Sequence, residues 1–344
     1  MRRFIQRTLN PAWYQGDHRK PPYFEGWYFK VVTPDEQQRY AFIPGVFLSN
    51  APHAFVQVLD GATGQAWYHE YPLDSFWAAK DRFEVHVGPN RFTSAVIGDT
   101  TMNLLIDRPD QQIRGELRFG GLAPWPVTLA APGIMGWYAW VPLMECYHGV
   151  VSLDHAIYGA LEIDGRTHDF TNGRGYIEKD WGRSFPQAWI WMQTNHFDAP
   201  ATSLTGSIAI IPWVRQAFPG FIVGFWHGGK LHRFATYTGA RTEQLAVTDE
   251  HVHWVLRNRT HRLQLFAERG ESNAFGLLKG PNTVEMGKRV AESLTAVVNV
   301  ELSETNGARR VLFAGNGRNA GLEVHDVQAL LALQGGEERG ARGE

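Results

Sequence analysis

The chain has 344 residues, a net charge of −2 and an aromatic content of 13%, with 13 Trp. It is long enough for one large or two ordinary domains, and its balanced charge predicts no basic field over the chain as a whole of the kind built for nucleic acid or anionic lipid. The single Cys146 excludes an intramolecular disulfide, and no segment reaches the ~20 apolar residues of a spanning helix.

Prolines at positions 11, 21 and 22 predict an irregular segment over residues 1–20. No apolar stretch of the kind that forms a signal peptide follows the basic N-terminus. We therefore expect a cytoplasmic protein, and peripheral contact with a membrane stays open.

The run YFEGWYFKVV, Tyr23–Val32, is aromatic and β-branched, which predicts a strand. Side chains alternate along a strand, so Glu25 shares the apolar face of Trp27. Two interpretations of Glu25 therefore stay open. It is an acid at the end of the strand, bonded to a neighbouring backbone group or to Arg, or it is a functional carboxylate.

Further short strands are predicted at regular spacing as far as Phe119, separated by turn signals such as Asp60-Gly61 and Pro109-Asp110. Such spacing without helical patterns favours an antiparallel sandwich or barrel. The Pro- and Gly-rich stretch from Gly120 to Gly136 predicts a long loop, a lid or a rim.

A second series of strands follows, and only Val324–Leu333 has a helical pattern. We predict an N-terminal β domain over residues 1–152, a C-terminal β domain over 153–334, and a disordered tail over 335–344, which lacks an apolar anchor.

Residues 173–197 combine acids with large aromatics, which is costly in an ordinary core. Glu178 and Asp180 share a strand face, so repulsion and burial would raise at least one pKa and provide a general acid. The alternative is a salt-bridged turn that uses Lys179, Arg174 and Arg183, and the residues alone favour it slightly.

Metal and nucleophile motifs are weak. His251 and His253 lie two apart, but Arg257 shares their face, as on the polar side of a half-buried strand. The sequence has no Gly-x-Ser-x-Gly, no phosphate loop and no Gly-x-Gly-x-x-Gly. We expect no metal site.

Four segments together resemble successive blocks of the tocopherol cyclase family, in order and spacing, over most of residues 20–230. The resemblance implies two lipocalin-like antiparallel β-barrel domains. The absence of a transit peptide and of the insertions of plastid members makes the chain similar to a bacterial branch. The blocks are YFEGWYFKV (Tyr23–Val31), SFWAAKDRFEVHVGPNRFTS (Ser75–Ser94), GWYAWVPLMECYHG (Gly136–Gly149) and YIEKDWGRSFPQAWIWMQTNHF (Tyr176–Phe197).

The resemblance also implies a reaction, the closure of the chromanol ring of a prenylated benzoquinol. A phenol oxygen adds to the nearest prenyl alkene under acid catalysis, without redox change or cofactor, as in an intramolecular lyase (isomerase). The expected partner is a small hydrophobic substrate, a prenylated quinol or a related terpenoid.

The same resemblance implies the site residues. The catalytic candidates are Glu25, Glu178 and Asp180 as acids and His148 as the group that accepts or orients the phenol proton. At the position of Asp180 the plastid members carry Asn. The candidates for substrate binding are Trp27, Tyr28, Trp137, Trp181, Trp189, Trp191, Gln193 and Asn195.

Two other functions stay open. A non-catalytic lipocalin-like carrier of an isoprenoid or lipid would have the same cavity with its acids paired at the rim. An interaction protein would present its aromatics as a flat exposed patch.

Overall fold

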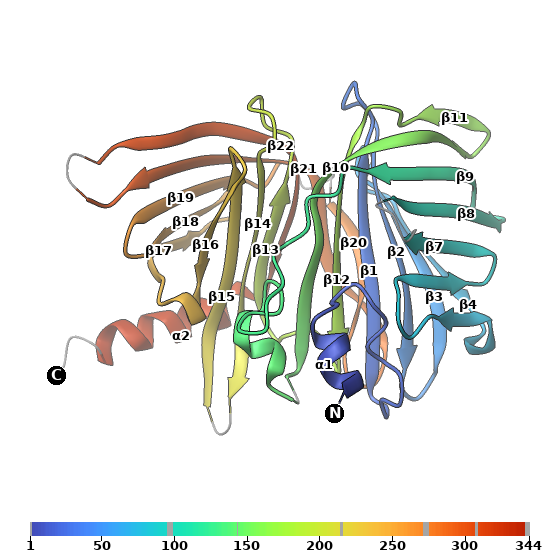
Figure 1. Ribbon diagram of the computed structural model, residues 1–344, viewed down its shortest axis with the longest axis horizontal. Coiled ribbons are helices and arrows are strands. Elements are labelled where there is room, and N and C mark those ends of the chain that lie inside the picture. Colours follow the sequence, from blue (N-terminus) through green and yellow to red (C-terminus); the bar gives the residue numbers. More distant parts are fainter. Residues whose placement is uncertain are drawn as a thin grey trace. The chain divides into compact units, whose positions relative to one another are not determined.

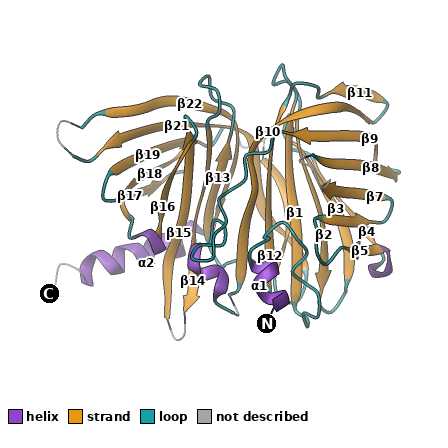
Figure 2. Ribbon diagram, in the orientation of Figure 1, coloured by secondary structure: helices purple, strands orange, loops and turns teal. Residues whose placement is uncertain are grey.

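The structure, a computed structural model, describes residues 2–94, 99–142, 144–213, 216–270, 275–306 and 309–340, without the side chains of 288, 289 and 335–340. The chain forms two compact units, Met1–Phe185 with Gly276–Arg289, and Pro186–Phe275 with Val290–Glu344. Strands dominate both units (Figure 2). The α-helices of the described residues are α1 (Arg2–Thr8) and α2 (Val327–Gly340), and neither is long and apolar enough to cross a membrane.

The first unit is built on a sheet of 12 strands in the described part of the chain, with the path β4-β3-β2-β1-β12-β10-β9-β8-β7-β6-β5 and β11 paired to β10 (Figure 1). The strands are β1 (Tyr23–Val32), β2 (Arg39–Leu48), β3 (His53–Asp60), β4 (Ala66–Tyr71), β5 (Phe76–Ala78), β6 (Glu84–Val87), β7 (Asn90–Ser94), β8 (Thr100–Arg108), β9 (Gln111–Gly120), β10 (Cys146–Ile163), β11 (Arg166–Asp169) and β12 (Arg174–Gly182).

This first sheet curls toward a barrel. His69 on β4 bonds across to Gln111 on β9 at 2.8 Å, and the Asn90 amide donates to the Tyr71 hydroxyl at 3.2 Å. The enclosed face is apolar because alternate residues of each strand point inward. Its core includes Trp27, Phe29, Phe92, Phe119, Leu161 and Ile177.

The second sheet follows the path β16-β15-β14-β13-β22-β21-β19-β18-β17, with β20 paired to β21, and most of its residues belong to the second unit. Gly276–Arg289, which holds nearly all of β20 and the start of β21, belongs to the first unit. The core of the second unit includes Ile190, Met192, Phe225, Trp254 and Leu322. The strands are β13 (Trp189–Thr194), β14 (Ser203–Trp213), β15 (Gln216–His227), β16 (Lys230–Ala235), β17 (Arg241–Val247), β18 (His251–Arg257), β19 (His261–Glu268), β20 (Phe275–Pro281), β21 (Met286–Glu304) and β22 (Val311–His325).

The predicted all-β class with lipocalin-like antiparallel units and a C-terminal helix is confirmed. The structure divides the chain elsewhere than the predicted boundary at residue 152. The reason is that β10 runs through that position without a break, and β12 is inserted between β10 and β1 of the first unit.

The termini differ from the prediction. Residues 2–8 form α1, because the prolines that exclude a helix begin only at Pro11. The C-terminal helix begins at Val327 and continues to Gly340, through most of the tail predicted to be disordered; residues 341–344 lie outside the described residues.

Strand pairing in the first unit divides the predicted site residues between two faces of the sheet. Glu25 is opposite Trp181 and Trp27 is opposite Lys179, and this face carries the barrel core. On the reverse face Tyr28 is opposite Glu178, and His148 of β10 is opposite Asp180.

Candidate active site

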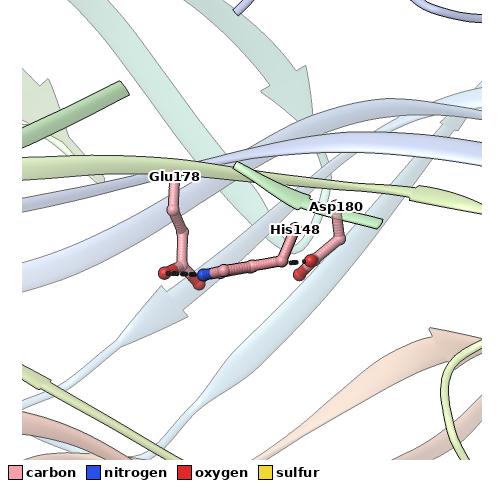
Figure 3. Close-up of side chains that lie close together, drawn as sticks. All are labelled: His148, Glu178 and Asp180. Atoms are coloured by element: carbon pink, nitrogen blue, oxygen red, sulfur yellow. Dashed lines mark hydrogen bonds and ion pairs between the residues drawn. The ribbon is translucent and has the colours of Figure 1, made fainter. Parts of the chain in front are cut away.

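His148 lies between two carboxylates on the reverse face of β10 and β12. Its Nδ1 is 2.9 Å from Asp180 Oδ1, and its Nε2 is 3.5 Å from Glu178 Oε2. Figure 3 shows the imidazole between the two acids, one on each side of the ring. The positions follow from register, because Asp180 is the direct partner of His148 and Glu178 is two residues along the same face.

The carboxylates decide the charge of the imidazole. Burial lowers the pKa of His148, but the charges of Glu178 and Asp180 and the hydrogen bond that His148 donates to Asp180 outweigh it and raise the pKa from 6.5 to about 9. At neutral pH His148 is therefore an imidazolium with a carboxylate at each nitrogen.

The two acids differ in environment. The Glu178 side chain is 6% exposed and accepts a hydrogen bond from the Tyr176 hydroxyl at 2.6 Å, whereas the Asp180 side chain is 28% exposed. Two carboxyl groups in unequal surroundings can hold different protonation states at one pH, as acid catalysis requires.

The same three side chains form the one potential metal-binding group found among the described residues, with ligand atoms within 4.8 Å of one another. A His and two carboxylates suit a divalent ion. Metal binding requires a neutral imidazole, so the raised pKa of His148 places a proton in competition with any metal.

A pocket reaches this cluster from the N-terminal helix. Its lining combines residues of α1 and of the segment 132–139 with Tyr147, His148 and Trp181, so His148 is the member of the cluster that the pocket touches. The rings of Tyr147 and Trp181 stack with centroids 5.4 Å apart and planes 6° apart, which makes one wall aromatic and flat.

Glu25 lies on the other face of the sheet, in a buried ion pair with Lys179. The Lys179 ammonium is 2.6 Å from Glu25 Oε1, and neither side chain is exposed. The carboxylate also accepts hydrogen bonds from the Gln15 backbone amide, at 2.9 and 3.0 Å, and from the Tyr23 hydroxyl. Donors of the protein itself thus occupy both oxygens of this carboxylate, which disfavours a role in contact with substrate.

Lys179 is the centre of this second cluster. Burial lowers its pKa to about 8, against the effect of Glu25. The ammonium donates to the Trp13 carbonyl and to the Pro11 carbonyl at 3.0 Å. Its nitrogen also lies over the rings of Trp27 and Trp181, 4.9 and 4.6 Å from the centroids. These two aromatic rings, predicted to bind substrate, thus contact a cation of the protein itself.

The salt-bridged turn considered from the sequence is not what the structure contains. β12 is a continuous strand through Glu178 and Asp180. Lys179 pairs with Glu25, and Arg174 pairs with Asp154 at 2.8 Å. The partner of the two acids is His148, from a neighbouring strand.

The remaining predicted residues have separate positions. Tyr28 is buried opposite Glu178. Trp137 is 44% exposed in a short 3-10 helix, Gly136–Trp140, and stacks on Tyr138.

Four predicted substrate-binding residues belong to the second unit. Trp189, Trp191 and Gln193 share one face of β13, and Asn195 follows the strand; all four are buried. The Trp189 indole donates to Glu323 Oε2 at 2.6 Å.

Sequence reasoning missed the contributions of Tyr176 and Lys179. Tyr176 lies two residues before Glu178 on β12, and the pattern Tyr-x-Glu could have suggested the hydrogen bond between them. Nothing local indicates that Lys179 pairs with Glu25, because that contact depends on the β1–β12 register.

Comparisons with known proteins place the chain in a family. Residues 105–325 match the family model described as tocopherol cyclase-like. The chain is 25% identical to a protein of Oryza sativa subsp. japonica named "Probable tocopherol cyclase, chloroplastic", over 80% of this chain and 68% of that protein. It is 22% identical to "Tocopherol cyclase, chloroplastic" of Zea mays, over 80% of this chain and 67% of that protein.

Among solved structures, "Crystal structure of CghA with Sch210972" is similar in fold, with a TM-score of 0.55, 13% identity and 89% of each chain covered. A second structure, "Crystal structure of CghA", gives the same TM-score at 14% identity and 90% coverage of each chain. At this identity the likeness supports the fold alone. With the family model matched over more than half of its length, the chain belongs to the tocopherol cyclase-like family.

Proposed function

We propose that this chain closes the chromanol ring of a prenylated benzoquinol, by acid-catalysed addition of a phenol oxygen to the nearest prenyl alkene. Family membership supports a cyclase-type function. The observation that carries the proposal is His148, which lines a pocket and is held between Glu178 and Asp180 on neighbouring strands. The reaction needs a proton donor, a proton acceptor and little water, and this cluster meets the first two demands.

Glu178 is the proton donor in this proposal. Its side chain is the more buried of the two acids, and burial favours the neutral carboxylic acid. Asp180, more exposed, holds Nδ1 of His148 and leaves Nε2 directed at Glu178. Resemblance to plastid members agrees, because an Asn at this position can still accept the Nδ1–H bond.

The proton balance closes within the cluster. The Nε2 proton of the His148 imidazolium passes to Glu178, which leaves a neutral imidazole and a carboxylic acid. Glu178 then protonates the alkene at the carbon that leaves a tertiary cation. The phenol oxygen attacks that cation, and its proton returns to Nε2 of His148. No net proton is gained or lost, and no oxidant is consumed.

Aromatic rings would shield the cation from water. Tyr28, which faces the same side as Glu178, is the ring of the first unit that we assign to this task. Trp189, Trp191, Gln193 and Asn195 keep their predicted role as substrate-contacting residues. Glu25, Trp27 and Trp181 are assigned instead to the ion-paired cluster around Lys179, which supports the barrel.

The test is incubation of the purified protein with phytyl- and farnesyl-benzoquinols under reducing conditions, in H2O and in D2O. We expect a chromanol, and in D2O one deuterium on the ring carbon next to the newly formed C–O carbon. Glu178→Gln should abolish product and retain quinol binding. Glu162→Gln, which alters a carboxylate paired with Arg114 on the surface of β10, is the matched control.

Failure of every quinol to turn over would overturn the proposal. Native mass spectrometry would then test the alternative function of a carrier, since an unmodified lipid retained by the wild-type protein identifies a binding protein.

A further inference from the structure

The loop before β10 has an unusual composition. From Gly121 to Met144 the sequence GLAPWPVTLAAPGIMGWYAWVPLM contains no Asp, Glu, Lys, Arg or His, in a chain that is 20% charged. Several of its large apolar side chains are exposed: Leu129 by 71%, Trp137 by 44% and Val127 by 37%. Exposed apolar residues of this size, gathered in one loop, indicate a contact surface.

The neighbouring helix supplies positive charge. α1 has the sequence RRFIQRT, and the first 20 residues carry five Lys and Arg (Arg2, Arg3, Arg7, Arg19, Lys20) against one acid, Asp17. Asp17 is partly neutralised already, by Arg3 at 3.3 Å and Lys80 at 3.2 Å. Phe4 and Ile5 of the same helix are exposed.

Direct contacts join the helix and the loop into one surface. The Phe4 and Trp140 rings lie 5.9 Å apart, and the Trp140 indole donates to the Leu129 carbonyl at 2.8 Å. α1 and residues 132–139 also line the pocket that His148 lines. Its lining therefore combines apolar side chains with Arg7 and Arg19.

We propose that α1 and the loop 121–144, called here the rim, dock the protein on an anionic lipid surface with the pocket mouth facing the lipid. Interfacial membrane contacts combine Trp and Leu, which enter the headgroup region, with Lys and Arg, which attract anionic headgroups. The uncharged loop meets the first requirement and the basic helix the second.

Docking on lipid can be tested independently of the reaction proposed for His148, Glu178 and Asp180, because lipid binding can be measured without turnover. It also gives the proposed function a route for substrate. A prenylated quinol dissolved in a bilayer could pass from the lipid into the pocket without crossing water.

The test is co-sedimentation of the full chain with vesicles of phosphatidylcholine, with and without phosphatidylglycerol. Wild-type protein should bind the anionic vesicles more tightly, and added salt should weaken the binding, because surface charge is screened beyond about 10 Å at 0.1 M. Arg2→Ala/Arg3→Ala should lower the partition coefficient by about ten- to thirty-fold, since each basic residue near such a surface contributes about five-fold.

The apolar part is tested by Val127→Ser/Leu129→Ser, which should lower the partition coefficient by about ten-fold. Leu105→Ser is the matched control: Leu105 is 50% exposed on β8, opposite Arg114 in the register, and the change should leave vesicle binding intact. Brominated lipids should quench wild-type Trp fluorescence more than that of Trp137→Phe.

Two results would overturn the inference: binding that ignores both vesicle composition and the rim variants, or a dimer in size-exclusion chromatography that Val127→Ser/Leu129→Ser dissociates. The second result would show that another copy of this chain covers the rim. Turnover of a short-tailed, water-soluble quinol by Val127→Ser/Leu129→Ser should equal that of wild type, which separates failure of docking from failure of the cyclase assignment.

Discussion

His148 Nδ1 and Asp180 Oδ1 lie 2.9 Å apart on neighbouring antiparallel strands, as direct register partners. Both residues lie inside paired strands, so this contact does not depend on the conformation of a loop. The bond orients the ring so that Nε2 faces Glu178, 3.5 Å away. In the proposed mechanism Asp180 holds the imidazole while Glu178 exchanges a proton with it, the division of labour that a catalytic His requires.

Turnover should be lost at high pH. His148 has a pKa of about 9, so below that pH the cluster holds the proton that the proposed mechanism uses, and above it the proton is gone. A profile of kcat between pH 6 and pH 10.5 should be level at first and then fall with an apparent pKa of about 9. A fall centred near 6.5 would contradict the ion-paired state of His148.

The same group links pH to stability. Its pKa in the folded protein lies above the ordinary 6.5, so its contribution is fully present below pH 6.5 and disappears as pH rises through about 9. The free energy of unfolding of wild type and of His148→Gln is measured with urea at pH 6 and at pH 10. The difference between the two proteins should be smaller at pH 10. An equal difference at both pH values would mean that His148 is neutral in the fold.

Changing Glu178 and Asp180 to their amides should lower kcat by different factors. Glu178→Gln removes the proposed donor and should lower kcat by about 10²–10⁴-fold, the usual contribution of general acid catalysis. Asp180→Asn keeps an oxygen acceptor for Nδ1–H and should lower kcat by less than about ten-fold, while it shifts the alkaline limb of the pH profile to lower pH because one carboxylate is lost. The reverse order of the two losses would identify Asp180 as the donor.

Tyr176→Phe should destabilise the protein and raise the pKa of Glu178. The change removes a 2.6 Å hydrogen bond to the Glu178 carboxylate, and hydrogen bonds to charged groups contribute about 1.5–3 kcal/mol. The free energy of unfolding should fall by about that amount. Since the lost bond stabilised the carboxylate, the pKa of Glu178 should rise, and a carboxyl-specific titration by NMR or infrared spectroscopy should show it.

The ion pair between Glu25 and Lys179 should be structural. Lys179→Met would leave a buried carboxylate without its cation and should cost about 3–5 kcal/mol in the free energy of unfolding. Glu25→Gln/Lys179→Met should recover most of that loss, since no buried charge remains, and should keep kcat within a few-fold of wild type. If the folded double variant lost turnover by a factor comparable to Glu178→Gln, Glu25 would be part of the catalytic machinery.

Alternation along single strands was readable from the residues. The period of two placed Glu25 with Trp27, and Glu178 with Asp180, and the structure confirms both pairs. The antiparallel class followed from strand spacing and turn residues, which depend on near neighbours in the chain. Glu25 and Glu178 could both be singled out as acids among aromatics, because burial of a carboxylate is unusual at any position.

Pairing between distant strands was decided only in three dimensions. The sequence ranked Glu25, Glu178 and Asp180 together, but β1 and β12 pair so that Glu25 faces Lys179 in the barrel while Glu178 and Asp180 face His148 on the reverse side. A shift of the register by one residue would exchange these faces without altering the local pattern. By itself the sequence determined the family resemblance, the strand content and the candidate acids. Which acid meets the histidine and which meets the lysine depends on long-range pairing, because hydrogen bonds between strands far apart in the chain follow from the packing of the whole barrel.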